Sequence, residues 1–244
     1  MRVREAALSM LFLVLPAGQG GAVVPGGSSP LAPVVAELFT SQGCDSCPPA
    51  EELLGELSRR PDVLALAFHV TYWDDLGWRD RFSFSDADAR QYRYASVLGR
   101  RGVYTPQLVV NGGREVVGSN RGDVLRAIGT AQPAAGFPLA MGGGTVQAEL
   151  LELGGGCDCE LVLLGVLPST QTAVASGENK GRVLQEFNVV RKIYPLAGWN
   201  GRAARRVHSL PAFPTDASLF VLLAQRRSDA RILAVGVTRA SPGD

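Results

Sequence analysis

The first regular hydrophobic pattern in the chain is the apolar run Val34–Phe39, which is rich in β-formers and predicts a strand buried on both faces. A helix is predicted next, because apolar residues recur at helical spacing and glutamates lie on the opposite side. The apolar residues are Ala50, Leu53, Leu54 and Leu57, and the glutamates are Glu51, Glu52 and Glu56. Pro61 marks the end of this segment. A second apolar run, Asp62–Val70, predicts another buried strand. This order predicts a right-handed βαβ unit with two parallel strands.

The pattern then continues through a further helix, a hairpin and a last helix. The polar stretch Arg79–Gly99 predicts a helix from about Asp86. Strands are predicted at Gln107–Val110 and Glu115–Val117, joined by an Asn-Gly turn. A helix is predicted from about Arg121.

After Gln132 the pattern changes to short β-like runs separated by turns. The Gly, Pro and Ala-rich stretch "PAAGFPLAMGGG" predicts a boundary. The six runs expected beyond it are Thr145–Leu151, Glu160–Val166, Thr170–Ala175, Val183–Ile193, Ser218–Ala224 and Arg231–Val237. The predicted fold class is therefore α/β over residues 34–132, followed by a β-rich, sandwich-like domain over residues 133–244.

The N-terminus has the layout of a secretory signal peptide at residues 1–22. Arg2 and Arg4 precede an apolar run, Ala6–Leu15, and small residues follow it. Residues 23–33 then predict a flexible leader. The run is too short to anchor the mature chain across a bilayer, and the alternative is a buried N-terminal helix. We expect a secreted or periplasmic protein, in a compartment where disulfides persist.

Composition and charge narrow the classes of partner. The 244 residues are 46% hydrophobic and 19% charged, which is typical of a globular protein. A net charge of +1 supplies no long-range field for nucleic acid or an anionic membrane, so we expect neither as a partner. No phosphate-cradling loop, metalloprotease motif or serine nucleophile elbow is present in the sequence.

The candidate chemistry lies in "GCDSCPP", where Cys44 and Cys47 follow the first strand. Because the carboxyl ends of parallel strands share one edge of a sheet, this pair should face the segment His69–Trp78 that follows the second strand. A Cys-x-x-Cys pair outside the cytoplasm can be a working dithiol, a structural disulfide or part of a metal site.

Several separated motifs carry a resemblance to known proteins. A strand ending in Cys-x-x-Cys, a helix, a parallel strand, a helical insertion, a Thr-Pro hairpin and a last helix resemble the thioredoxin fold. More narrowly, "ELFTSQGCDSCPPAEELL", "FHVTYWDDLGW", "RQYRYA", "VYTPQLVVNG", "GENKGR" and "NVVRKI" resemble the secreted proteins of domain-of-unknown-function family 1223 (DUF1223). This resemblance implies a fold and not an established reaction.

The thioredoxin-like resemblance implies roles for three residues near the dithiol. Pro106 would be cis and pack against the cysteines, which would leave the Thr105 backbone free to pair with a bound peptide. Glu37 lies roughly where such enzymes keep a buried acid that helps deprotonate the second cysteine, although a shift of one residue in register would turn it to the other face.

The leading hypothesis is a thiol–disulfide oxidoreductase that needs no cofactor and acts on a protein or small thiol or disulfide. Cys44 would be the exposed nucleophile and Cys47 the resolving cysteine. Asp45 should oppose formation of a Cys44 thiolate, and Pro48 and Pro49 place the regular helix start close to Cys47. These departures leave the direction of exchange open.

Two other functions remain open from the sequence. A non-enzymatic binding module would use the bridge only as a staple. A metal protein could bind copper through the dithiol and His69, or zinc through four thiolates that include Cys157 and Cys159. In an apolar strand such as this one, however, a histidine is more often packed and hydrogen-bonded in the core than bound to a metal, which favours a structural role for His69.

The remaining candidate residues have weaker assignments. Tyr72, Trp73 and Trp78 could line a substrate groove or pack in the core. Asp74, Asp75 and Asp80 are interpreted as solvated loop or capping residues. Cys157 and Cys159 could form a local disulfide only through a tight turn. "GENKGR" and "NVVR" are interpreted as structural turn and strand-edge segments.

Overall fold

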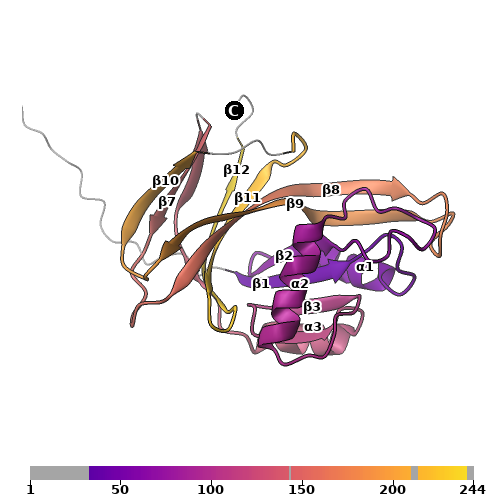
Figure 1. The fold of residues 1–244 in the computed structure, drawn as a ribbon, viewed down its shortest axis with the longest axis horizontal. Coiled ribbons are helices and arrows are strands. Elements are labelled where there is room, and N and C mark those ends of the chain that lie inside the picture. The colour runs from indigo at the N-terminus through magenta and orange to yellow at the C-terminus, as the bar shows by residue number, and fades with distance from the viewer. Residues whose placement is uncertain (1–32, 143, 210–213, 241–244) are drawn as a thin grey trace, which may run out of the picture.

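The structure is a computed structural model, and it describes residues 33–142, 144–209 and 214–240 (Figure 1). The predicted signal peptide and most of the predicted leader lie outside these residues. In the first half of the chain, β1 is Val34–Thr40, α1 is Pro48–Leu57 and β2 is Val63–His69. β1 and β2 pair in parallel, with Thr40 opposite His69, so both carboxyl ends lie at the same edge. The predicted βαβ unit is confirmed.

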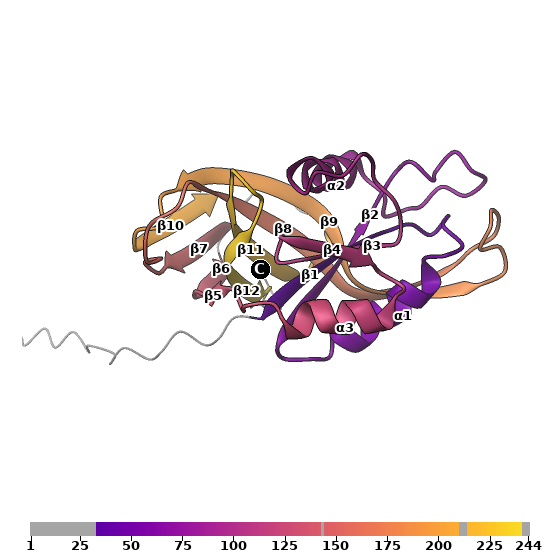
Figure 2. The ribbon, with the colours of Figure 1, turned by 90° about the horizontal axis from the view of Figure 1, so that it is seen from below.

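The next elements complete a compact α/β segment. α2 is Ser85–Val97, β3 is Gln107–Val110, β4 is Arg114–Val117 and α3 is Arg121–Gly129. β3 pairs antiparallel with β4, which confirms the predicted hairpin, and it also pairs antiparallel with β1. Figure 2 shows α2 on one face of the sheet, and α1 with α3 on the other. Alternation along β1 explains the two layers, because Val34, Ala36 and Leu38 face α1 and α3, whereas Val35 and Phe39 face α2.

In the described part of the second half of the chain, all the regular elements are strands. Its elements are β5 Ala135–Gly136, β6 Leu139–Gly142, β7 Thr145–Leu150, β8 Cys159–Ala173, β9 Val183–Trp199, β10 Ala204–Ser209, β11 Leu219–Arg226 and β12 Ile232–Arg239. Five of these extend the first sheet in the order β4-β3-β1-β2-β9-β8-β11-β12-β5, and β10-β7-β6 form a second sheet. The junction is a parallel pairing of β2 with β9, where Ala67 lies opposite Val189.

The large sheet therefore takes strands from both sides of the boundary predicted after Gln132. The smaller sheet packs over its far half, around a core that includes Leu150, Leu161, Trp199 and Phe220. The two layers resemble the expected sandwich, but the larger layer is continuous with the sheet of the first segment. The fold is accordingly mixed α/β, with one sheet common to both halves.

Several strand predictions for this half need correction. The runs Glu160–Val166 and Thr170–Ala175 are one strand, β8, without a turn between them. Pro168 has no amide to donate, and the pairing is preserved on either side of it, with Leu167 opposite Val189 and Ser169 opposite Phe187. The Gly, Pro and Ala-rich stretch contains β5 and β6, and β10 was not predicted.

The long hairpin β8–β9 projects beyond the other C-terminal strands as an arm. In both ribbon views its tip lies beside α1 and the loop after β1 (Figures 1 and 2). The tip is the loop of residues 174–182, which we call the arm loop. Gly55 of α1 has no side chain, and a Cβ there would lie 2.4 Å from the Phe187 ring of β9. The absence of that side chain allows the arm to pack closely on α1.

Candidate functional site

The candidate site is centred on the loop between β1 and α1. Cys44 and Cys47 form a disulfide in this loop. Cys47 is also the N-cap residue of α1, and prolines occupy the first helical positions, where amides have no intrahelical partner. The intervening Asp45 and Ser46 are exposed, but Cys44 is 0% and Cys47 1% exposed. The prediction that Cys44 is an exposed nucleophile is therefore wrong for the disulfide form.

The arm loop contributes to this burial. Asn179 is fully buried, and its side-chain amide donates hydrogen bonds to the carbonyl oxygens of Gln42, at 3.0 Å, and of Cys44, at 2.8 Å. Asn179 belongs to "GENKGR", which the sequence suggested was only a structural turn. Its contacts place this motif directly on the disulfide loop.

A buried carboxyl group lies beside the disulfide. Glu51, in the first turn of α1, is 6% exposed and shares a small cavity of about 10 Å³ with Cys47, His69 and Glu186. Burial raises the pKa of Glu51 from 4.5 to about 7. His69 and the nearby Thr40 hydroxyl partly offset this rise. Among the described residues, no side chain makes a hydrogen bond of normal geometry to either carboxyl oxygen. The sequence placed Glu51 on the exposed side of α1, which is wrong.

His69 lies on the other side of this cavity and is held by Asp80. Its Nδ1 is 2.6 Å from Asp80 Oδ2, and its Nε2 is 4.0 Å from Glu51 Oε1. Burial disfavours the charged ring, but the Asp80 carboxylate outweighs this and raises the pKa of His69 to about 9. His69 is thus the packed, hydrogen-bonded core histidine that the strand pattern favoured.

Asp80 was predicted to be a solvated loop residue or a capping residue; the first is wrong, because Asp80 is buried, and its contacts with backbone amides fit the second. Its carboxylate accepts hydrogen bonds from the backbone amides of Gln42 and Phe82, each at 2.8 Å, as well as facing His69. Burial raises its pKa, but His69 and these amides reverse the effect and hold the pKa below 3.8. Asp80 therefore joins the loop after β2 to the disulfide loop. Asp74 supports it by accepting the Asp80 amide at 3.1 Å, and Asp75 is exposed.

Gln42 connects the disulfide loop to the arm. Its side-chain amide donates to Glu186 Oε1 at 2.7 Å and to Thr172 Oγ1 at 3.0 Å. Its side-chain oxygen, Oε1, accepts a hydrogen bond from the indole nitrogen of Trp78 at 2.9 Å. Trp78 is thus a structural contact of the loop, and the arm is fixed to the site by buried polar groups.

Glu37 does not serve the disulfide. It lies on the sheet face that packs against α2, opposite to α1, and its carboxylate accepts a hydrogen bond from Arg90 Nε at 2.7 Å and another from the Tyr94 hydroxyl. The suggestion that Glu37 is the buried acid beside the second cysteine is wrong, because the strand register turns it to the other face. Glu51 is the acid that lies beside Cys47.

The Thr105–Pro106 peptide bond is cis. A Cβ on Gly118 would lie 3.3 Å from both Ala50 and Pro106, so the start of α1 and the Pro106 bend meet across this glycine. Trp73 bridges the same region, since its indole nitrogen donates to Thr105 Oγ1 at 2.8 Å while its Cβ faces Gly43. Pro106 is buried and Thr105 half-buried.

The other residue proposed for substrate binding, Tyr72, is 37% exposed. Its hydroxyl donates to Gln91 Oε1 at 3.2 Å, and burial raises its pKa to about 12. Tyr72 and Trp73 thus lie on the loop that borders the Thr105–Pro106 bend.

A second disulfide joins Cys157 to Cys159, with Cα atoms 5.4 Å apart. Cys159 opens β8, whereas the Cys44–Cys47 loop contacts the arm loop beyond the far end of that strand. A strand of 15 residues spans about 45 Å. The four-thiolate zinc site is therefore wrong. Over residues 33–142, 144–209 and 214–240, no group of three or more His, Cys, Asp and Glu side chains is arranged to hold a metal ion.

The comparisons with known proteins agree on the architecture. The crystal structure of protein AGR_C_4864 from Agrobacterium tumefaciens is similar at 28% identity and a TM-score of 0.70, over 87% of this chain and 97% of that one. HBP35 of Porphyromonas gingivalis is similar at 14% identity and a TM-score of 0.54, over 87% and 76% of the two chains, which reflects a shared fold. No curated protein matches the chain. None of the described helices is long and apolar enough to cross a bilayer. The family described as "Protein of unknown function (DUF1223)" matches residues 35–225, and the chain therefore belongs to the DUF1223 family.

Proposed function

We propose that this protein is a thiol–disulfide oxidoreductase that uses Cys44 and Cys47 on a thioredoxin-like arrangement of β1, α1, β2, β3, β4 and α3. The observation that carries the proposal is the buried Glu51 carboxyl beside Cys47, whose pKa is raised to about 7. A carboxyl group that is buried without a hydrogen-bond partner costs stability. A purely structural disulfide has no use for such a group, whereas exchange requires a proton acceptor near the resolving thiol.

The reaction follows from these positions. In the reduced protein, the Cys44 thiolate attacks one sulfur of a substrate disulfide, which forms a mixed disulfide and releases the first substrate thiolate. Cys47 then transfers its proton to the Glu51 carboxylate and attacks the Cys44 sulfur. This step forms the Cys44–Cys47 bond and releases the second substrate thiolate, which takes up a proton. The substrate gains the two electrons that the cysteine pair loses, and the reverse sequence oxidises a substrate dithiol.

Access to the sulfurs requires a local opening, because both are buried in the disulfide form. A surface groove of about 520 Å³ runs beside the disulfide loop and is lined by Asp45, Pro48, Pro49, Glu52, Arg182, Val183 and Leu184. Pro48 and Leu184 line both this groove and the cavity that holds Glu51. Displacement of the arm tip, including the start of β9 that carries Leu184, would therefore open a route from solvent to Cys47, and Tyr72, Trp73 and Thr105 would border the substrate.

The same burial favours a second candidate function. A non-enzymatic binding module would keep Cys44–Cys47 as a staple that fixes the loop for the arm. A buried bridge that serves only as a staple resists the glutathione pool, whereas an exchange centre has a moderate reduction potential. The two functions thus differ in whether the bridge opens under mild redox conditions.

Secretion or export to the periplasm is part of the proposal. The signal-peptide layout of residues 1–22 supports it, as do two disulfides in one chain, because such bridges persist in oxidising compartments. The substrate would be a protein or a small thiol or disulfide in that compartment.

The test uses the Cys157→Ser/Cys159→Ser variant, so that Cys44 and Cys47 are the only cysteines whose redox state is measured. The protein is equilibrated in glutathione redox buffers, and its free thiols are counted by alkylation and mass spectrometry. Cys47→Ser in the same background should trap a mixed disulfide at Cys44, and the matched Cys44→Ser/Cys47→Ser control should trap none. If the Cys44–Cys47 disulfide stays closed at every glutathione ratio and no mixed disulfide is trapped, the oxidoreductase proposal is wrong and the binding module with a structural disulfide is supported.

A further inference from the structure

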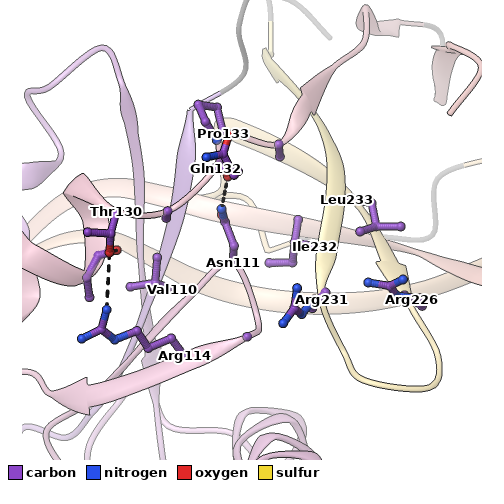
Figure 3. A pocket seen from close by; sticks show the side chains of 14 residues that line it. Val110, Asn111, Arg114, Thr130, Gln132, Pro133, Arg226, Arg231, Ile232 and Leu233 are labelled. Carbon is purple, nitrogen blue, oxygen red and sulfur yellow. Dashed lines mark hydrogen bonds between the residues drawn. The ribbon is translucent and has the colours of Figure 1, made fainter. Parts of the chain in front are cut away.

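A second cavity lies away from the disulfide, at the seam between the β3–β4 hairpin, the end of α3 and the β11–β12 hairpin. Its volume is about 440 Å³, within the range of small-molecule sites. Figure 3 shows Arg114 on one side of this cleft, and Arg226 and Arg231 on the other, with Asn111 and Ile232 between them. None of these residues takes part in the chemistry of the disulfide site.

The walls of the cleft are held in place by backbone contacts. Asn111 accepts the Val35 amide at 2.7 Å through its side-chain oxygen and donates its amide to the Gln132 carbonyl at 2.7 Å. Its own carbonyl accepts the Ile232 amide at 3.0 Å. Gly112, at φ +67°, packs so closely that a Cβ would lie 2.0 Å from the Ala230 carbonyl oxygen. A preformed cleft spares a ligand the entropy of ordering its site.

Positive charge exceeds negative charge around the cleft. Arg226 and Arg231 share one carboxylate, Asp229, at 3.0 and 3.6 Å. Arg114 contacts the Thr130 hydroxyl at 3.4 Å, and no carboxylate of the described residues pairs with it. Three guanidinium groups against one carboxylate leave an excess of two positive charges. This excess of charge matches that of a dianion. The planar guanidinium group of arginine can donate two parallel hydrogen bonds to the oxygen atoms of such an anion.

The end of α3 does not cancel this field. A helix C-terminus presents free carbonyl groups, which repel anions. Here the Thr130 amide and hydroxyl both donate to the Arg126 carbonyl, at 3.2 and 2.8 Å, and the Ala131 amide donates to the Ile128 carbonyl at 3.1 Å. These carbonyl groups are therefore already satisfied.

Half of the lining residues are apolar. They come from β3, α3, the segment after α3 and β12: Val110, Ala127, Ala131, Pro133, Ala134, Ile232 and Leu233. Such a surface gains free energy when an apolar group of the ligand covers it. An inorganic anion would leave this surface exposed.

We propose that the cleft binds a small phosphate monoester: a dianion held by Arg231 and by Arg114, once the Arg114 side chain turns from Thr130 toward the cleft, and joined to a compact apolar group that packs on Ile232 and its neighbours (Figure 3). The proposal does not depend on the redox chemistry of Cys44 and Cys47. It assigns to the seam between the two halves of the chain a role in ligand binding.

Phenyl phosphate is a suitable probe, titrated into the full chain at pH 7.5 and low salt by isothermal calorimetry. We expect saturable binding, at least tenfold tighter than that of inorganic phosphate or benzoate. Arg114→Gln and Arg231→Gln should each weaken it fivefold or more, while Arg126→Gln, an exposed arginine on α3 outside the lining, should leave it unchanged. Absence of saturation, equal affinity for inorganic phosphate, or an equal loss in the Arg126 variant would overturn the proposal.

Amide chemical shifts of the wild-type protein supply a test that does not depend on the folding of any variant. Phenyl phosphate should shift the amides of Asn111, Gln132 and Ile232 in proportion to occupancy. Shifts confined to other parts of the chain would refute the assignment of the ligand to this cleft.

Discussion

Replacing Glu51 by Gln should change how stability depends on pH. Gln has the same size and cannot ionise. Wild-type Glu51 has a folded-state pKa of about 7 and an ordinary value of 4.5 in the unfolded chain, so the folded state binds the proton more tightly. Stability from this group is fully present below pH 4.5 and is lost as the pH rises to 7. The Glu51→Gln variant should not show this loss of stability, because its glutamine side chain does not ionise.

The size of the effect follows from the same pKa values. At about 1.4 kcal/mol for each pH unit, a change from 4.5 to about 7 corresponds to roughly 3 kcal/mol in full. Between pH 5 and pH 8 most of this is lost, or roughly 2–3 kcal/mol. His69, whose pKa is raised from 6.5 to about 9, adds a further loss from pH 6.5 upward, and this loss is smaller in the variant because Glu51 is one of the charges that raise the pKa of His69. The wild type should therefore lose more stability than the variant over this interval.

Urea unfolding of the oxidised proteins at pH 5 and pH 8, followed by tryptophan fluorescence, measures this difference. Glu52→Gln is the matched control, because Glu52 is the adjacent residue of α1 and is exposed. Its pH dependence should equal that of the wild type. If the Glu51 variant and the wild type lose the same free energy between the two pH values, then Glu51 does not titrate in the folded protein near pH 7, and its role as proton acceptor fails.

Three further predictions test other parts of the structure. Asn179→Ala removes two hydrogen bonds to the disulfide loop, worth about 1–3 kcal/mol together, so reduction of Cys44–Cys47 by dithiothreitol should accelerate about tenfold or more in an alkylation time course. Arg90→Met leaves the buried Glu37 carboxylate with only the Tyr94 hydroxyl and no positive charge beside it, and should cost about 3–5 kcal/mol in urea unfolding; a loss under 1 kcal/mol would contradict a contribution of the buried ion pair to stability. Gly118→Ala puts a Cβ 2.7 Å from Leu38 and should cost about 1–3 kcal/mol, whereas an unchanged melting temperature would show that the chain relaxes there.

The elements of the first half could be predicted because each carries its own local signal. The apolar runs of β1 and β2 and the helical spacing of α1 need no knowledge of distant residues, and the Asn-Gly pair marks the β3–β4 turn. Asn111 does adopt a positive φ of 46° in that turn. Local pattern was also sufficient to place the cysteine pair between β1 and α1.

The environment of the cysteines could not be predicted in this way. Glu51 lies next to the apolar stripe of α1 and looks exposed on an isolated helix, but β9 covers it with Leu184 and Glu186. Those residues follow more than 130 positions later, and nothing in the sequence indicates that the β8–β9 arm reaches back to α1. Asp80 was misassigned for the same reason, because its partners Gln42 and His69 lie on separate elements.

The site is thus a joint product of the two halves of the chain. The first half supplies the disulfide, the acid and the cis bend, and the arm covers the disulfide loop and Glu51 through Asn179, Leu184 and Glu186. Burial is the main cause of the raised pKa of Glu51, so the group's readiness to take a proton near pH 7 depends on the arm being closed. An opening that admits a substrate also admits water, which would lower the pKa of Glu51. Opening and closing of the arm would therefore alternate between exposing the sulfurs and restoring the buried proton acceptor.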